Sequence, residues 1–213
     1  KIPIRTSHSN FFFKSVDVSK KINVEKNISS IIKKNKKIDV IINNAAISVF
    51  SKFYNRTNSE LDKTINTNIK GTLNIINAYV KFHKLKKLKK CNIINIGSIY
   101  GMLSPDFRIY GKKDRYNSEI YGATKASIIQ LTKYYSVILS KLNINVNCLS
   151  PGGIYNEKKP QSSSFIKKYS LLVTKARMAN SEDLHTGILF LASSKSNYVS
   201  GQNITIDGGL SSW

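Results

Sequence analysis

The chain has 213 residues, of which 41% are hydrophobic and 10% aromatic, and its formal net charge is +22 at pH 7. This length allows one substantial core and is too short for two ordinary domains, so we expect a single domain over 1–213. No stretch approaches the roughly 18 consecutive apolar residues that a membrane-spanning helix needs. We therefore expect no membrane segment and a cytoplasmic protein.

The basic charge raises the question of a nucleic-acid partner. Lysines are spread through nearly every segment, and the only dense run, at 84–90, closes an apolar helix. Cations at that position oppose the negative end of the helix dipole. The pattern therefore favours a solvated helix end, and we expect no nucleic-acid partner.

The two cysteines, Cys91 and Cys148, lie far apart in apolar segments. They have no C-x-x-C spacing and no histidine nearby, so we expect no metal site. The pattern is typical of buried thiols in a reducing compartment.

Short apolar runs alternate with longer segments of helical period, which indicates a parallel sheet flanked by helices. The run at 11–16 predicts a strand, and a helix over 23–36 follows it. Further strands are predicted at 39–43, 92–96, 144–149 and 203–206. Further helices are predicted as a successive pair within 59–88, at 119–141 and near 181–193. The stretch from 151 to about 165, with Pro, Gly and Ser, predicts a flexible loop.

Two motifs follow predicted strands directly, at the edge where open parallel sheets bind ligands. The first is NNAA at 43–46, whose small side chains let a flat cofactor approach and whose amides can tie neighbouring strands together. The second is Ser98 in INIGSIYG, where Gly97 permits a tight backbone path.

A third motif pairs a phenol with an ammonium. Tyr121 and Lys125 are four positions apart in a predicted helix, so they share one face of it. Tyr155 and Lys159 have the same spacing but lie in a loop that ends at Pro160. We interpret this second pair as a coincidence of a lysine-rich sequence.

The motifs in this order resemble the short-chain dehydrogenase/reductase family, whose active site combines an asparagine, a strand-end serine and a Y-x-x-x-K pair. NNAA is similar to the family's N-N-A-G, Pro151-Gly152-Gly153 to its P-G loop, and SGQNITIDGG to its C-terminal strand. The resemblance runs from about residue 11 to the end. It implies an α/β fold of Rossmann type, a doubly wound parallel sheet with helices on both faces.

The resemblance implies an NAD- or NADP-dependent oxidoreductase whose catalytic residues are Asn68, Ser98, Tyr121 and Lys125. Tyr121 acts as acid/base, Ser98 holds the substrate oxygen, and Asn68 positions a water in the proton relay. Because a free phenol ionises near pH 10, a neighbouring ammonium must stabilise the phenolate, and Lys125 supplies it. Besides Tyr121 and Lys125, the implied cofactor-binding residues are Asp17, Val18, Asn44, Ala45, Ala46, Pro151, Gly152 and Ile154.

Each residue also has a purely structural interpretation. Tyr121 would be an amphipathic helix residue, Lys125 a solvated cation, Ser98 a turn former and Asn68 a helix-kinking amide. Strand ends and turns commonly use the residue types implied for the cofactor site. The coincidence of independent motifs in one order favours the catalytic interpretation.

The eleven glycines begin at Gly71, so no glycine-rich phosphate loop precedes the NNAA strand. By the resemblance, 11–16 corresponds to the third strand of the family's sheet order 3-2-1-4-5-6-7. The chain then lacks the first strand, first helix and second strand, together with the residue that distinguishes NAD from NADP. We expect an N-terminally incomplete chain that by itself folds poorly and binds NAD(P) weakly.

Ser98 and Tyr121 are 23 positions apart, because an extra segment, SPDFRIYGKKDRYNSE, separates them. Its IYG-x-x-x-PDFRIY pattern resembles oxidoreductases of flagellin and surface-glycan modification of the legionaminic acid type. This predicts a small-molecule substrate, a sugar or nucleotide-sugar. The basic side chains that would either contact its phosphate or carboxylate or be solvated are Arg108, Lys112, Lys113 and Arg115.

Three alternatives remain open. A 3-oxoacyl-[acyl-carrier-protein] reductase would use surface cations to steer an acidic carrier. A non-catalytic relative would sense a nucleotide or act as a scaffold, and a nucleic-acid-binding protein would show steep salt dependence. For the enzyme, the resemblance implies a homodimer or homotetramer that assembles through helices near 70–88 and 119–141.

Overall fold

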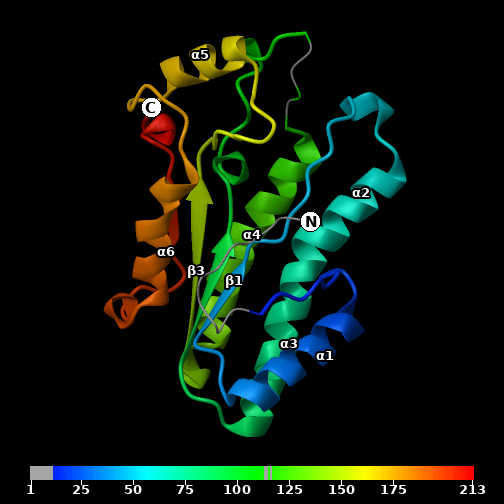
Figure 1. The fold of residues 1–213 in the computed structure, drawn as a ribbon, viewed down its shortest axis with the longest axis vertical. Helices are drawn as coiled ribbons and strands as arrows, with labels where there is room; N and C mark the ends of the chain where they lie inside the picture. Colours follow the sequence, from blue (N-terminus) through cyan, green and yellow to red (C-terminus); the bar gives the residue numbers. More distant parts are fainter. Residues whose placement is uncertain (1–11, 113–114, 116) are drawn as a thin grey trace.

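The computed structural model describes residues 12–112, 115 and 117–213. Strands in this part of the chain form one parallel sheet in the order β1-β2-β3-β4 (Figure 1). Their bounds are β1 Val40–Asn43, β2 Cys91–Ile96, β3 Ile144–Pro151 and β4 Asn203–Ile206. The four strands predicted after residue 38 are thus confirmed, in the neighbour order that the family resemblance implies.

Helices alternate with the strands, as predicted. They are α1 Lys21–Asn35, α2 Asn58–Ile65, α3 Gly71–Lys86, α4 Glu119–Ile138, α5 Ser163–Leu172 and α6 His185–Ala192. A π-helical turn, Asn66–Lys70, joins α2 to α3. α1, α3 and α4 contribute to the core on one face of the sheet and α6 to the core on the other, so the sheet is covered from both sides (Figure 1).

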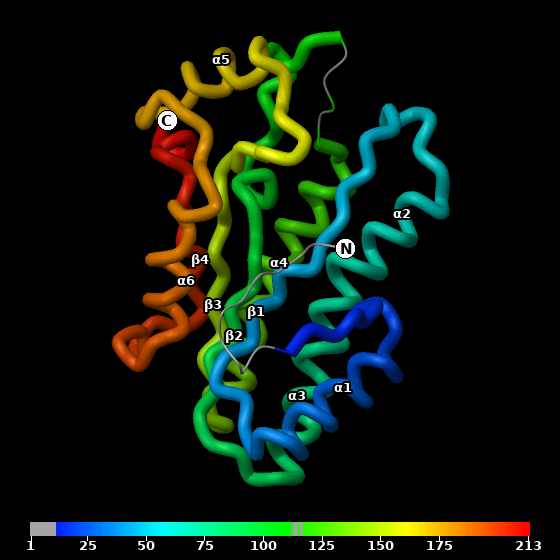
Figure 2. Tube along the Cα trace, in the orientation of Figure 1, coloured from blue at the N-terminus to red at the C-terminus, as the bar shows by residue number. Residues whose placement is uncertain are grey.

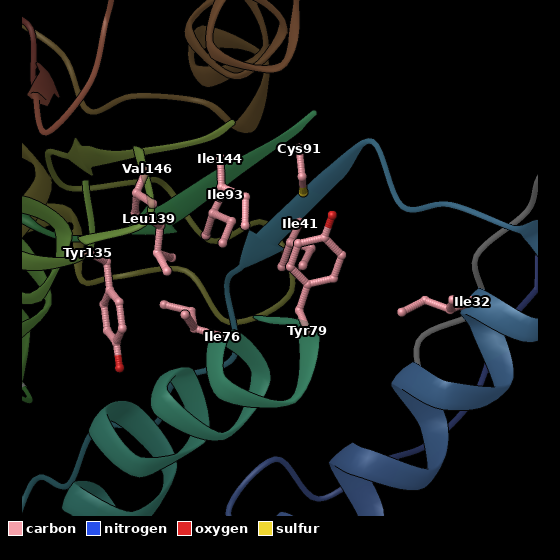
Figure 3. Close-up of a cluster of buried hydrophobic side chains, with 10 residues drawn as sticks. All are labelled: Ile32, Ile41, Ile76, Tyr79, Cys91, Ile93, Tyr135, Leu139, Ile144 and Val146. Atoms are coloured by element: carbon pink, nitrogen blue, oxygen red, sulfur yellow. The ribbon is translucent and has the colours of Figure 1, made fainter. Parts of the chain in front are cut away.

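The strand register divides the core into two layers. Ile41, Ile93 and Val146 stand side by side on neighbouring strands and face Ile76 and Tyr79 of α3 (Figure 3). Because successive strand residues point to opposite faces, the residues beside them face the other way. Ile94 and Leu149 pack there against Leu191 of α6.

The predicted strand at 11–16 is wrong for its described part, because residues 12–16 form no strand and Phe12 and Phe13 are exposed. Phe11 lies outside the described residues. A strand requires ladder hydrogen bonds to a neighbour, and the described residues supply none beside this segment. β1 is therefore the edge of the described sheet, and its Ile42 is 45% exposed.

The structure adds α5, which the sequence analysis assigned in part to a flexible loop. Ser162 caps this helix by accepting a hydrogen bond from the Phe165 backbone N–H at 3.2 Å. Phe165 and Tyr169 pack against Ile109, which belongs to the segment between β2 and α4. Figure 2 shows α5 and this segment together at the carboxyl end of β3.

Candidate active site

A pocket of about 790 Å³ opens at the carboxyl ends of β1, β2 and β3. This is the edge at which open parallel sheets bind ligands. The predicted site residues that line it are Asn44, Ala46, Ser98, Tyr121, Lys125, Pro151, Gly152 and Ile154. Those that do not line it are Asp17, Val18, Ala45 and Asn68.

Tyr121 and Lys125 lie in the first two turns of α4. The Ser118 hydroxyl caps this helix by accepting a hydrogen bond from the Tyr121 backbone N–H at 3.3 Å. Both side chains line the pocket, and the Lys125 ammonium is 5.7 Å from the centre of the Tyr121 ring. Of the second Tyr/Lys pair, Tyr155 lies in a loop before Pro160 and does not line this pocket, whereas Lys159 does.

A close backbone contact brings Ser98 to Tyr121. Ser98 caps the short helical turn Ile99–Gly101, and a Cβ atom at Gly101 would lie 2.7 Å from the Lys125 carbonyl carbon. Glycine is therefore required for this turn to pack directly on the backbone of α4. This packing brings Ser98 close enough to Tyr121 for their side chains to interact.

Lys125 is a buried cation, with only 4% of its surface exposed, so the interpretation as a solvated lysine is wrong. Its Nζ donates a 2.7 Å hydrogen bond to the Ile96 carbonyl oxygen, and no carboxylate among the described residues pairs with it. Burial lowers the pKa of Lys125 to about 8, while the charge interaction with Cys148 opposes this shift. An ammonium carries three donors, so donors remain for a ligand in the pocket.

The pKa of Tyr121 is raised, chiefly because burial disfavours the phenolate, whereas a side-chain hydrogen bond with Ser98 acts in the opposite direction. The net shift is therefore opposite to the lowering that was expected from Lys125. Tyr121 is a neutral phenol at pH 7, the form that donates a proton.

Asn68 lies behind the pocket, in the π-helical turn between α2 and α3. Its amide accepts a 2.8 Å hydrogen bond from the Ile47 backbone N–H and donates to the Ile47 carbonyl at 2.9 Å. It also donates to the Thr124 hydroxyl at 3.0 Å, one residue before Lys125. Asn68 thus connects the π-helical turn to α4 through Thr124. Its position in an irregular helical turn agrees with the interpretation as a helix-kinking amide. Its role in a proton relay stays a prediction.

Asp17 and Val18 lie away from the pocket, beside α3. The Asp17 carboxylate accepts hydrogen bonds from the Ser19 backbone N–H and hydroxyl, at 2.9 and 2.7 Å. The Val18 carbonyl accepts a 3.0 Å hydrogen bond from the Asn74 amide, and a Cβ atom at Gly71 would lie 2.6 Å from the Val18 side chain. These contacts hold the segment against α3, and the cofactor contact of Asp17 and Val18 stays a prediction.

The NNAA motif ties the sheet together as expected. Asn43 donates a 2.8 Å hydrogen bond to the Asn95 amide oxygen, and Asn95 donates to the Thr132 hydroxyl of α4 at 2.9 Å. Asn44 and Ala46 then face the pocket, whereas Ala45 is exposed outside it.

The sequence analysis missed a group of aromatic residues that line the pocket. The rings of Tyr110 and Phe165 are 5.2 Å apart, those of Phe165 and Tyr169 5.7 Å, and the Tyr100 and Tyr110 hydroxyls 3.1 Å. The (i, i+4) spacing of Phe165 and Tyr169 was a usable signal for a helical face. We call Tyr100, Tyr110, Phe165 and Tyr169 the aromatic wall; all four line the pocket.

Arg56 binds the N-terminal end of α4. Its side chain is 2% exposed and binds the Glu119 carboxylate through two hydrogen bonds, at 2.7 and 2.9 Å. A third hydrogen bond, at 2.9 Å, joins it to the Ser51 hydroxyl. This pair connects the segment after β1 to the first residue of the helix that carries Tyr121.

Replacing Arg56 by Met should lower the free energy of unfolding by about 1–3 kcal/mol, because three charge-assisted hydrogen bonds are lost from a buried position while the half-exposed Glu119 is rehydrated. Urea unfolding measures this change. Arg108→Met is the control, since Arg108 pairs with Asp106 at the surface and its loss should cost no more than about 0.5 kcal/mol. Equal losses in the two variants would contradict the bracing role of Arg56.

Among the residues that the structure describes, no helix is both long and apolar enough to cross a membrane. The same part of the chain contains no group of three or more His, Cys, Asp or Glu side chains arranged to hold a metal ion. Both cysteines are buried and unpaired.

Comparison with known proteins identifies relatives along nearly the whole chain. A family model described as enoyl-(acyl carrier protein) reductase matches residues 4–211. A 3-oxoacyl-[acyl-carrier-protein] reductase of Thermotoga maritima is 32% identical over 200 residues, which are 92% of this chain and 75% of the relative. The post-translational flagellin modification protein A of Campylobacter coli is 31% identical over 157 residues, 74% of this chain and 59% of that protein.

The same comparison extends to solved structures. A short-chain dehydrogenase from Leptospira borgpetersenii with bound NAD+ is 39% identical, has a TM-score of 0.90, and the match covers 99% of this chain and 80% of that one. Fold, pocket and relatives agree, and the chain belongs to the short-chain dehydrogenase/reductase family of NAD(P)-dependent oxidoreductases.

Proposed function

We propose that the protein interconverts a secondary alcohol and a ketone on a sugar or nucleotide-sugar, with Tyr121 as acid/base. The observation that carries the proposal is the convergence of Ser98, Tyr121 and Lys125 on one pocket at the carboxyl edge of the sheet. The three side chains come from two elements that a glycine contact holds together. Their arrangement matches the needs of carbonyl reduction.

In the proposed reduction, Ser98 donates a hydrogen bond to the substrate carbonyl oxygen and holds it beside Tyr121. Tyr121, a neutral phenol, donates its proton to that oxygen as charge develops on it. The Lys125 ammonium stabilises the phenolate that remains, because an opposite charge in a poorly solvated site lowers the free energy of the ionised form. Asn68 keeps α4 in position through Thr124.

The residues of the pocket fit the nicotinamide riboside of NAD(P). Lys125 is buried with one backbone partner, so its remaining donors suit ribose hydroxyls. Ala46 presents a small side chain to the pocket, and Pro151, Gly152 and Ile154 line it as well. When bound, NAD(P)H supplies the hydride of the reaction.

Two features support a sugar-like substrate. Aromatic faces and hydroxyl groups line the pocket together, and amide side chains of Asn117, Asn156 and Gln161 add further hydrogen-bonding groups. Polyhydroxylated rings use both kinds of contact. The similarity to the Campylobacter flagellin modification protein supports the surface-glycan setting.

Reduction of a 3-oxoacyl thioester is the second candidate function. The similarity to the Thermotoga reductase supports it, since that relative covers more of this chain than the flagellin modification protein does. The aromatic wall would then contact an acyl chain.

A substrate panel separates the two functions. NAD(P)H oxidation is followed with acetoacetyl-N-acetylcysteamine, and NAD(P)+ reduction with N-acetylneuraminate and UDP-N-acetylglucosamine. We expect kcat/KM for a sugar substrate to exceed that for the thioester by about tenfold or more, since a polar pocket disfavours partners that leave its polar groups unpaired. Preference for the thioester would replace the sugar proposal with the acyl one.

We further propose that the protein is a homo-oligomer assembled through α3 and α4. Exposed apolar side chains on the outer part of α4, Tyr134, Val137 and Ile138, support this proposal. Light scattering of the purified protein measures the oligomeric state, and a monomer at micromolar concentration would contradict it.

A further inference from the structure

The charges of the substrate pocket are of one sign. Its lining contains three cations, Arg115, Lys125 and Lys159, and no Asp or Glu from the described residues. Lys125 is buried beside Tyr121, in the proposed catalytic set. Arg115 comes from the segment between Ser98 and Tyr121. Lys113 of the same segment lies outside the described residues.

Arg115 differs from the other arginines that the structure describes. Arg56 pairs with Glu119, Arg108 with Asp106, and Arg177 with Asp183, and each pair has an N–O distance below 3 Å. Arg115 lines the pocket and pairs with no described carboxylate. The sequence left Arg108 and Arg115 either to contact an anion or to be solvated, and Asp106 already pairs with Arg108.

Arg115 is exposed, and its guanidinium lies over an aromatic ring. Its central carbon is 5.3 Å from the centre of the Phe50 ring, and Phe50 also lines the pocket. A guanidinium over an aromatic face keeps its N–H donors free at the edge of the group. Those donors match the two oxygens of a carboxylate or phosphate.

We propose that Arg115 forms an anion subsite in the substrate pocket, so that the preferred substrate is a polyhydroxylated ring bearing a carboxylate or a phosphate. This inference rests on the proposed sugar oxidoreductase function and narrows its substrate class. The aromatic wall contacts the ring, Ser98 and Tyr121 contact the reacting oxygen, and Arg115 contacts the anionic group. Hydrogen bonds to charged groups are typically worth about 1.5–3 kcal/mol, which corresponds to roughly 10- to 150-fold in affinity.

Isothermal titration calorimetry with NAD+ present measures binding of matched probes. N-acetylneuraminate is compared with its methyl ester, which differs by the charge, and N-acetylglucosamine 1-phosphate with N-acetylglucosamine. We expect the wild-type protein to bind at least one anionic probe about tenfold or more tightly than its neutral match. The pair that shows this preference identifies carboxylate or phosphate as the source of the anion.

Two variants locate the effect. Arg115→Gln should remove the preference for the anionic probe, whereas Arg108→Gln, in the same segment but paired with Asp106, should retain it. Equal wild-type affinities within both pairs, no binding of any probe, or a preference unchanged in Arg115→Gln would overturn the subsite. Turnover of neutral and anionic sugars alike would leave the oxidoreductase proposal standing while the subsite fails, and thioester turnover alone would reject the sugar function itself.

Discussion

Tyr121→Phe should lower kcat by roughly 10²- to 10⁴-fold, the range typical of a lost general acid. The substitution removes one hydroxyl and keeps the ring, so the packing of α4 against the turn after β2 should persist. The lost group interacts with Ser98 and belongs to a buried phenol whose raised pKa keeps it protonated at pH 7. Steady-state kinetics with the preferred substrate of the panel measures the effect.

Tyr155→Phe is the matched control for this variant. Tyr155 also stands four positions before a lysine, but it lies in a loop and outside the substrate pocket. Its activity should equal that of the wild-type protein. A comparable loss of activity in both variants, or retained activity in Tyr121→Phe, would contradict the role of Tyr121 as acid/base.

Lys125→Met should abolish activity and at the same time stabilise the protein. Burial of the ammonium lowers the pKa of Lys125 from 10.5 to about 8, which corresponds to a cost of about 3 kcal/mol in the folded state at pH 7. Methionine has a similar length and no charge, so most of this cost disappears. The lost hydrogen bond to Ile96 would subtract about 1 kcal/mol from the gain.

The pH dependence of unfolding tests the cause of this stabilisation. Because the pKa of Lys125 is lower in the folded protein, the unfolded chain binds more protons between about pH 8 and 10.5. The free energy of unfolding of the wild-type protein should therefore rise through this window, and that contribution should be missing in Lys125→Met. Lys133→Met, at an exposed position of the same helix, is the control and should change stability by no more than about 0.5 kcal/mol. If Lys125→Met were less stable than the wild-type protein, the claim that the buried Lys125 ammonium destabilises the folded state would be wrong.

The strands and most helices could be predicted because their signals are local. β4 has its predicted bounds, and β1 and β2 each differ by one residue, since short apolar runs bounded by polar residues define them. The run at 11–16 carries the same signal and forms no strand in its described part. Strand formation also depends on a neighbour, which no local pattern reveals.

Non-local contacts explain the elements that the sequence analysis missed. α5 begins in a serine-rich stretch that resembles a loop, and its buried face meets the segment that follows β2. In the π-helical turn Asn66–Lys70, Asn68 binds the backbone of Ile47, 21 positions away. Propensity within a window of the chain contains no information about either contact.

In the candidate site, too, local motifs could be predicted from the sequence and contacts between distant residues could not. Ser98, Tyr121 and Lys125 were predicted because motifs at strand ends and along one helix face fix their positions. The Arg56–Glu119 pair and the aromatic wall join residues far apart in the chain, so only the structure reveals them. The placement of Asp17 and Val18 beside α3, outside the pocket, likewise depends on tertiary contacts.

Deuterium transfer measures the proposed reaction directly. The protein is incubated with its ketone substrate and with NADH or NADPH deuterated at the transferring position, and the product is examined by mass spectrometry. We expect deuterium on the new carbinol carbon with the wild-type protein and none above background with Tyr121→Phe. Product without deuterium, or equal transfer by the two proteins, would contradict an oxidoreductase that acts through Tyr121.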